Sequence, residues 1–155
     1  MVNFYRMESI YWQHLLLTEW SNTMSISILI ADESAAARKN LMSAMPSEWD
    51  VIFSEASNGN DALAACHRGQ ASVLFLDTTL PGMSNSDLMD ALDRANAETS
   101  VIIVSADARA SMRGEARAHG AVAFVEKPVR PEALASVLKA CHLFNSDMLE
   151  MSEAF

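Results

Sequence analysis

Five short apolar runs that alternate with helix-like segments constrain the fold of this 155-residue chain more than any other feature. The runs are strand candidates and lie at Ser25–Asp32, Asp50–Ala56, Ser72–Asp77, Thr99–Asp107 and Ala121–Pro128. Strands that are apolar along most of their length are buried on both faces, which is typical of a parallel sheet. Parallel strands need helical crossovers between them, and these cover the faces of the sheet. The sequence therefore predicts an α/β fold, a doubly wound five-stranded parallel sheet with helices on both faces.

The segments between these runs carry helix signals. Ser34 and Ser84 stand at expected N-cap positions, where a hydroxyl accepts an otherwise unpaired backbone N–H. The expected helices are Ser34–Met45, Asn58–Gly69, Ser84–Ala95, Asp107–Gly120 and Arg130–Phe144. Gly114 lies inside the fourth of them, and because glycine is a poor helix former we expect that helix to be weak.

Composition and charge exclude several classes of function. The net charge of −9 argues against sequence-independent binding to DNA or RNA, which requires lysine and arginine to neutralise phosphates. No apolar stretch approaches the roughly 20 residues that a membrane-spanning helix needs, and Glu8 and Glu19 interrupt the N-terminus, which does not resemble a signal peptide. Cys66 and Cys141 lie far apart without a CxxC motif, so we expect reduced, mostly buried thiols in a cytoplasmic protein.

Polar and charged residues stand where four of the apolar runs end. Asp32 and Glu33 close the first run, Asp77 the third and Ser105 the fourth, and Lys127 follows the fifth. Ligand sites of parallel sheets form at the carboxyl ends of the strands, so we expect these side chains to meet. Crowded carboxylates repel one another unless a divalent cation joins them, and Mg²⁺ favours oxygen ligands with room for water and phosphate. One carboxylate could then act as a nucleophile toward phosphorus, with the metal and the lysine neutralising the phosphoryl charge.

Each of these residues also has an ordinary structural interpretation. Asp32 or Asp77 alone is more often a helix cap or a loop acid, and a lone lysine such as Lys127 is usually solvated. Ser105 alone could be a turn residue at a strand end. The joint placement of these side chains at one edge of one sheet is what favours a functional site.

Four motifs resemble those of the response regulator receiver domain, the phosphoacceptor half of bacterial two-component signalling. They are ILIADES (28–34), LFLDTTLPGM (74–83), VIIVSA (101–106) and GAVAFVEKP (120–128). The resemblance covers residues 25–144 and implies the flavodoxin-like strand order 2-1-3-4-5. It leaves an N-terminal extension at 1–24 and a C-terminal tail at 145–155. Because this tail is too short for an output domain, we expect a stand-alone receiver domain.

The resemblance implies a role for each strand-end residue. Asp77 matches the phosphorylated aspartate, and Lys127 matches the family's lysine beside it. Asp32 and Glu33 match the acidic pair that holds Mg²⁺, together with Asp77 and the backbone carbonyl of Thr79. Glu33 departs from the family, in which aspartate is commonest at this position.

The same resemblance implies a conformational switch. Ser105 matches the hydroxyl that moves toward the phosphoryl group, and Phe124 matches the aromatic side chain that turns inward on activation. The family usually has a cis peptide bond at the position of Lys127 and Pro128, a bond that proline makes at low cost. Asn85 stands where the family often has glycine, and since asparagine tolerates a left-handed backbone we expect the turn to survive.

The implied function is that of a phosphoacceptor response regulator. Its partners would be a histidine kinase or a histidine phosphotransfer protein as donor and a downstream protein as target, with dimerisation through the fourth helix, fifth strand and fifth helix as one option. It would catalyse its own phosphotransfer and dephosphorylation without being a metabolic enzyme. The alternative is a receiver-fold interaction module that acts without phosphorylation. An aspartate-nucleophile phosphatase is a poor third hypothesis, because such enzymes typically carry a second aspartate at the position of Thr79.

The N-terminal extension has two interpretations. Tyr11, Trp12, Leu15, Leu16 and Trp20 recur at helical spacings, which indicates an amphipathic helix that docks on the domain or on a partner. Alternatively, Met24 is the natural start and the preceding residues are not native, because MSISILIADES reads as an ordinary beginning.

Overall fold

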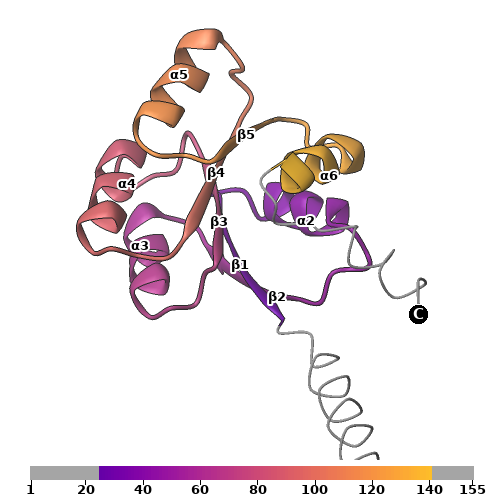
Figure 1. Ribbon diagram of the computed structural model, residues 1–155, viewed down its shortest axis with the longest axis horizontal. Helices are drawn as coiled ribbons and strands as arrows, with labels where there is room; N and C mark the ends of the chain where they lie inside the picture. The colour runs from indigo at the N-terminus through magenta and orange to yellow at the C-terminus, as the bar shows by residue number, and fades with distance from the viewer. Residues whose placement is uncertain (1–24, 141–155) are drawn as a thin grey trace, which may run out of the picture.

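Five parallel strands in the order β2-β1-β3-β4-β5 form the centre of the computed structural model, which describes residues 25–140 (Figure 1). The strands are β1 (Ile26–Ala31), β2 (Val51–Ala56), β3 (Val73–Asp77), β4 (Ser100–Ser105) and β5 (Ala123–Glu126). The helices are α2 (Ala35–Ala44), α3 (Gly59–His67), α4 (Asn85–Arg94), α5 (Ala110–Ala118) and α6 (Pro131–Ala140). The predicted doubly wound fold and its strand order are confirmed.

The helices form a layer on each face of the sheet (Figure 1). Helices α2 and α6 lie on one face, where Leu41, Leu134 and Leu138 belong to one buried apolar cluster. Helices α3 and α4 lie on the other face, where Ala62 and Leu88 belong to a second buried cluster. The sheet is therefore covered on both sides, as its apolar strands require.

Strand β3 shows why the sequence places so many apolar residues before Asp77. Every residue of the strand is buried. Val73 and Phe75 belong to the cluster under α2 and α6, and Leu74 and Leu76 belong to the opposite cluster. Successive side chains of a strand point to opposite faces, so a strand between two helical layers needs an apolar residue at each position. The burial of β3 holds Asp77 rigidly at the carboxyl edge of the sheet.

Side-chain caps begin three of the helices, two of them at the serines that the sequence predicts and the third at Asn58. Oxygens of Ser34, Asn58 and Ser84 each accept the backbone N–H of the residue three positions later. Each cap satisfies one of the N–H groups that the first turn of a helix leaves unpaired.

Helix α5 begins three residues later than the sequence predicts. The Asp107 carboxylate accepts both the backbone N–H and the guanidinium of Arg109, and these contacts form a turn before the helix. No residue of α5 is buried, and its N-cap makes no side-chain hydrogen bond. Gly114 lies within this helix, so the expectation of a weakly held helix agrees with its packing.

Residues 1–24 and 141–155 lie outside the described part of the chain. The predictions about the N-terminal extension, the tail and the last residues of the closing helix fall there, as does Cys141. Cys66 is buried and free, as expected. Within residues 25–140, no helix is both long and apolar enough to cross a lipid bilayer.

Candidate functional site

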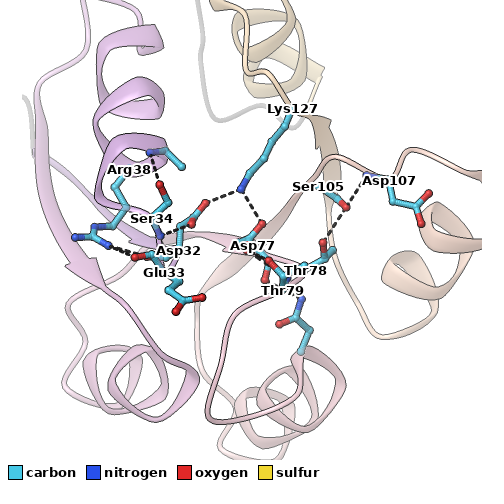
Figure 2. A network of polar contacts seen from close by, with 12 residues as sticks. Asp32, Glu33, Ser34, Arg38, Asp77, Thr78, Thr79, Ser105, Asp107 and Lys127 are labelled. Carbon is cyan, nitrogen blue, oxygen red and sulfur yellow. Dashed lines mark hydrogen bonds and ion pairs between the residues drawn. The ribbon is translucent and has the colours of Figure 1, made fainter.

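The parallel strands bring four of the predicted residues together at the carboxyl edge of the sheet (Figure 2). Asp77 ends β3, Ser105 ends β4, Asp32 follows β1, and Lys127 follows β5. Asp32 is 7% exposed, Asp77 5% and Ser105 1%. A polar group loses its hydration at such positions, so its hydrogen-bond partners within the protein determine its charge and orientation.

The Lys127 ammonium joins the two buried aspartates. It donates to Oδ2 of Asp32 at 2.6 Å and to Oδ1 of Asp77 at 2.8 Å. Burial alone would lower the pKa of Lys127, but the hydrogen bonds and negative charges of both carboxylates outweigh it and raise the pKa above its ordinary value of 10.5. Lys127 is therefore a cation at neutral pH, and it lies between two acidic side chains.

Arginine and backbone contacts hold the segment that carries Asp32. The backbone N–H of Ser34 donates to Oδ1 of Asp32 at 2.8 Å. The Arg38 guanidinium donates to the backbone carbonyls of Asp32 and Glu33, at 2.8 and 3.3 Å, and to the carboxylate of Glu55 at 2.8 Å. Arg38 thus ties the end of β1 to α2 and β2, which orients the acidic pair.

Glu33 occupies a different environment from Asp32. Its side chain is exposed, and Figure 2 shows it pointing away from the Lys127 ammonium. The structure therefore brings Asp32 and Asp77 together and leaves Glu33 at the rim of the site.

The loop after β3 folds back onto Asp77. Both the backbone N–H and the hydroxyl of Thr79 donate to Oδ2 of Asp77, at 3.2 and 2.6 Å. The Asn85 side-chain amide donates to the backbone carbonyl of Asp77 at 3.1 Å. Asn85 is the first residue of α4 and does not have a positive φ, and the left-handed position in this loop is Gly82 at φ 93°. Asn85 thus supports the loop through its side chain, and not through the left-handed backbone considered from the sequence.

The Ser105 hydroxyl is bonded away from Asp77. Its Oγ lies 2.8 Å from Oγ1 of Thr78 and accepts the backbone N–H of Asp107 at 3.0 Å. Figure 2 shows these contacts on the side of the site toward α5.

Phe124 lies in β5 and is half-buried. The Arg113 guanidinium of α5 lies 4.5 Å from the centre of its ring, a cation–π contact. Arg113 also lies 3.9 Å from the Glu126 carboxylate. Helix α5 therefore rests partly on polar and ring contacts to β5.

The peptide bond between Lys127 and Pro128 is cis. A cleft of about 380 Å³ opens beside this bond, lined by Asp32, Asp77 and Lys127 and by apolar residues that include Leu41 and Val129.

The oxygen donors of the site fit a hard divalent cation, although they are not gathered as a finished metal centre. Within residues 25–140, no three carboxylate, histidine or cysteine side chains lie close enough to hold a metal ion. Two carboxyl groups, those of Asp32 and Asp77, nevertheless face the single ammonium of Lys127, and hard oxygen ligands suit Mg²⁺. Glu33 and the backbone carbonyl of Thr79 remain predicted ligands.

Two contacting residues were not identified from the sequence, and a third, Asn85, was predicted in a different role. Arg38 is an ordinary helix residue in the sequence, Thr78 an ordinary loop residue, and Asn85 was considered for its backbone. Their side chains act across elements that are distant in the sequence or through a loop whose path the sequence does not specify. The adjacency of Thr78 to Asp77 was the one available signal.

A doubly wound sheet with two buried aspartates, a bridging lysine and a buried serine hydroxyl at its carboxyl edge defines a receiver-type α/β domain. The response regulator receiver domain family matches residues 28–139, most of the chain. The chain belongs to this family.

The curated relatives differ in how much of their length this chain covers. The chain is 26% identical over 115 residues to the chemotaxis protein CheY of Thermotoga maritima, covering 74% of this chain and 96% of CheY. It is 30% identical over 116 residues to the positive alginate biosynthesis regulatory protein of Pseudomonas aeruginosa, covering 74% of this chain and 46% of that protein. It is 29% identical over 114 residues to the transcriptional regulatory protein BtsR of Salmonella typhi, covering 73% and 46%. The chain thus spans nearly all of CheY and about half of the other two.

Solved structures have the same fold. The signal receiver domain of the response regulator NarL from Mycobacterium tuberculosis matches with a TM-score of 0.67 at 22% identity, covering 76% of this chain and 97% of that domain. The response regulator domain of Thermotoga maritima CheB matches with a TM-score of 0.64 at 26% identity, covering 78% and 99%.

Proposed function

We propose that this protein is a phosphoacceptor response regulator that receives a phosphoryl group on Asp77 from a histidine kinase or a histidine phosphotransfer protein. The observation that carries the proposal is the buried pair of Asp32 and Asp77 joined by Lys127 beside an open cleft. Membership of the receiver domain family supports it.

The transfer is a displacement at phosphorus. A carboxylate oxygen of Asp77 forms a bond to phosphorus while the bond from phosphorus to the imidazole nitrogen of the donor breaks, and the nitrogen keeps that electron pair. Lys127 holds Asp77 in place and offers positive charge to the phosphoryl oxygens. Mg²⁺, held by Asp32, Glu33, Asp77 and the Thr79 carbonyl, would supply further charge neutralisation when bound.

The output of the proposed reaction is a change of surface. A phosphorylated Asp77 adds negative charge and strong acceptor oxygens, toward which Ser105 would turn, and Phe124 would then rotate inward. The surface of α5, β5 and α6 would bind a downstream protein or a second copy of the chain. We place this function in the cytoplasm and expect no direct binding to nucleic acid.

A phosphorylation-independent interaction module is the second candidate. The outward side chain of Glu33 favours it, because that side chain is one of the predicted metal ligands. A titration with Mg²⁺ separates the two candidates, since the module has no need to bind the metal.

The test of the proposed function is intact-protein mass spectrometry after incubation with acetyl phosphate and Mg²⁺. We expect the wild type to gain one phosphoryl group and Asp77→Asn to gain none, because the amide is not a nucleophile toward phosphorus. Asp93→Asn, an exposed carboxylate of α4, serves as the matched control and should gain the group as the wild type does. Full phosphorylation of Asp77→Asn, or equal phosphorylation of the wild type in EDTA, would show that the assignment is wrong.

A further inference from the structure

We propose that Thr78 is a positioning residue that holds the Ser105 hydroxyl in the resting arrangement and thereby sets the sensitivity of the switch. The proposal rests on the proposed function, because it concerns the response to a phosphoryl group on Asp77. It concerns a residue to which the family resemblance assigned no role: Thr78, whose hydroxyl lies 2.8 Å from that of Ser105.

The resting contacts of Ser105 all lead away from Asp77. The Ser105 hydroxyl lies 2.8 Å from the Thr78 hydroxyl and accepts the backbone N–H of Asp107 at 3.0 Å. The carboxylate of Asp77 accepts its hydrogen bonds from Lys127 and Thr79 instead. In the resting site, the Ser105 hydroxyl and the Asp77 carboxylate therefore belong to two separate hydrogen-bond networks.

The exposure of the two residues indicates which hydroxyl donates. Ser105 is 1% exposed, so its proton has no access to water and needs an acceptor within the protein. Thr78 is half-buried and can direct its own proton to solvent. Every hydrogen bond of the Ser105 hydroxyl is satisfied when it accepts the backbone N–H of Asp107 and donates its own proton to the Thr78 hydroxyl.

A phosphoryl group on Asp77 would compete with Thr78 for that proton. Phosphoryl oxygens are charged acceptors, and hydrogen bonds to charged groups are stronger than those between neutral hydroxyls. When Ser105 turns to the phosphoryl group, the half-buried Thr78 can regain a partner from water. The free energy needed to leave the resting state is therefore about that of one neutral hydrogen bond. Thr78 determines it, because Thr78 is the partner in that bond.

The position of Thr78 connects this bond to helix α5. Thr78 lines a cavity of about 220 Å³ between α4 and α5, together with Met112 and Ala116 of α5. Since α5 has no buried residue, a Thr78 side chain that Ser105 has released can change its contacts with a loosely packed helix.

The experiment measures the affinity for beryllofluoride, a mimic of the phosphoryl group, in the presence of Mg²⁺ by amide NMR. A ligand that favours the switched state binds more tightly when the resting state loses stability. We expect Thr78→Val, which keeps the shape and removes the hydroxyl, to lower the Kd by roughly two- to tenfold, the equivalent of one neutral hydrogen bond. Thr78→Ala removes the same hydroxyl and should shift the Kd in the same direction.

Three controls separate a positioning role from a loss of packing. Thr78→Ser keeps the hydroxyl and should restore the wild-type Kd. Thr99→Val removes a threonine hydroxyl that donates to the Ala71 carbonyl far from the site, and should leave the Kd unchanged. In a Ser105→Ala background, Thr78→Val should have no further effect on the Kd.

The outcomes distinguish this inference from the function on which it rests. If the wild type does not respond to beryllofluoride, both the proposed function and the role of Thr78 are wrong. If the wild type responds but Thr78→Val and Thr78→Ala bind no more tightly, or Thr78→Ser behaves as they do, the role of Thr78 alone is overturned.

Discussion

At the scale of single residues, the site depends on one ammonium between two buried carboxylates. Lys127 lies 2.6 Å from an oxygen of Asp32 and 2.8 Å from an oxygen of Asp77. Removing one partner of such a group leaves the others without compensation for their lost hydration. Lys127 therefore contributes to the stability of the fold as well as to the chemistry of the site.

We predict that Lys127→Met lowers the free energy of unfolding near neutral pH by roughly 1–3 kcal/mol, below the range for a fully buried pair because the lysine side chain is 27% exposed. The folded-state pKa of Lys127 is raised above 10.5, so its contribution is complete below that value and is lost as the pH rises through the folded pKa. Urea unfolding of both proteins at neutral and alkaline pH measures this difference.

The exposed Lys139 of α6 provides the matched control, and Lys139→Met should unfold as the wild type does. A difference between Lys127→Met and the wild type that persists unchanged well above the lysine pKa would contradict this account of the ion pair.

At the scale of elements, the loop between β3 and α4 is held against α3 by a close backbone contact. The backbone N–H of Gly59, the first residue of α3, donates to the Pro81 carbonyl at 2.8 Å. A Cβ atom at position 59 would lie 2.7 Å from Cβ of Met83 and 3.0 Å from its backbone N and O. Glycine thus allows the loop that contains Thr79 to approach the helix.

We predict that Gly59→Ala displaces this loop and lowers the free energy of unfolding by about 1–3 kcal/mol, the usual cost of overpacking. The displacement should also weaken Mg²⁺ binding, because Thr79 is a predicted ligand. Urea unfolding and a Mg²⁺ titration provide the two measurements. Unchanged values in both would show that Met83 moves aside freely.

Gly114 of α5 provides the opposite case, because no atom beyond the neighbouring helix backbone lies within 4 Å of a Cβ placed there and its φ is not positive. We predict that Gly114→Ala stabilises α5 by roughly 0.5–1 kcal/mol, the difference in helix propensity. Hydrogen exchange of the α5 amides should slow accordingly. Exchange that stays equal or becomes faster would show that this glycine does not limit the helix.

At the scale of the whole molecule, residues 25–140 contain all five strands and two buried apolar clusters. Each cluster draws on the central strands and on helices of one face, so the sheet and its layers form one cooperative unit.

We predict that a chain beginning at Met24 folds cooperatively and binds Mg²⁺, because the described core starts at β1. Thermal melts of this shorter chain and of the full chain give the comparison. A shorter chain that is unfolded at room temperature would show that Tyr11, Trp12 and Leu16 belong to the core.

Much of the molecule could be predicted from local patterns. The apolar runs predicted the five strands, and the caps at Ser34 and Ser84 predicted helix starts. The strand ends predicted that Asp32, Asp77, Ser105 and Lys127 would share one edge, since parallel strands bring their carboxyl ends together. Periodicity and capping depend on neighbours in the sequence, which is why the sequence expresses them. The strand order was obtained from family resemblance and not from the apolar pattern.

Only the tertiary structure decided which of these side chains bond to one another. It shows Lys127 between Asp32 and Asp77, Ser105 paired with Thr78, and Glu33 turned outward. It also shows α5 starting late, because the Asp107 carboxylate binds Arg109 before the helix begins. A side chain at the end of a strand can turn to several partners, and the choice depends on distances set by elements far apart in the sequence. The sequence by itself thus determined the sheet and the edge at which the site lies. Packing determined which side chains of the site bond to one another, because hydrogen bonds form only between atoms that the fold has already brought within reach.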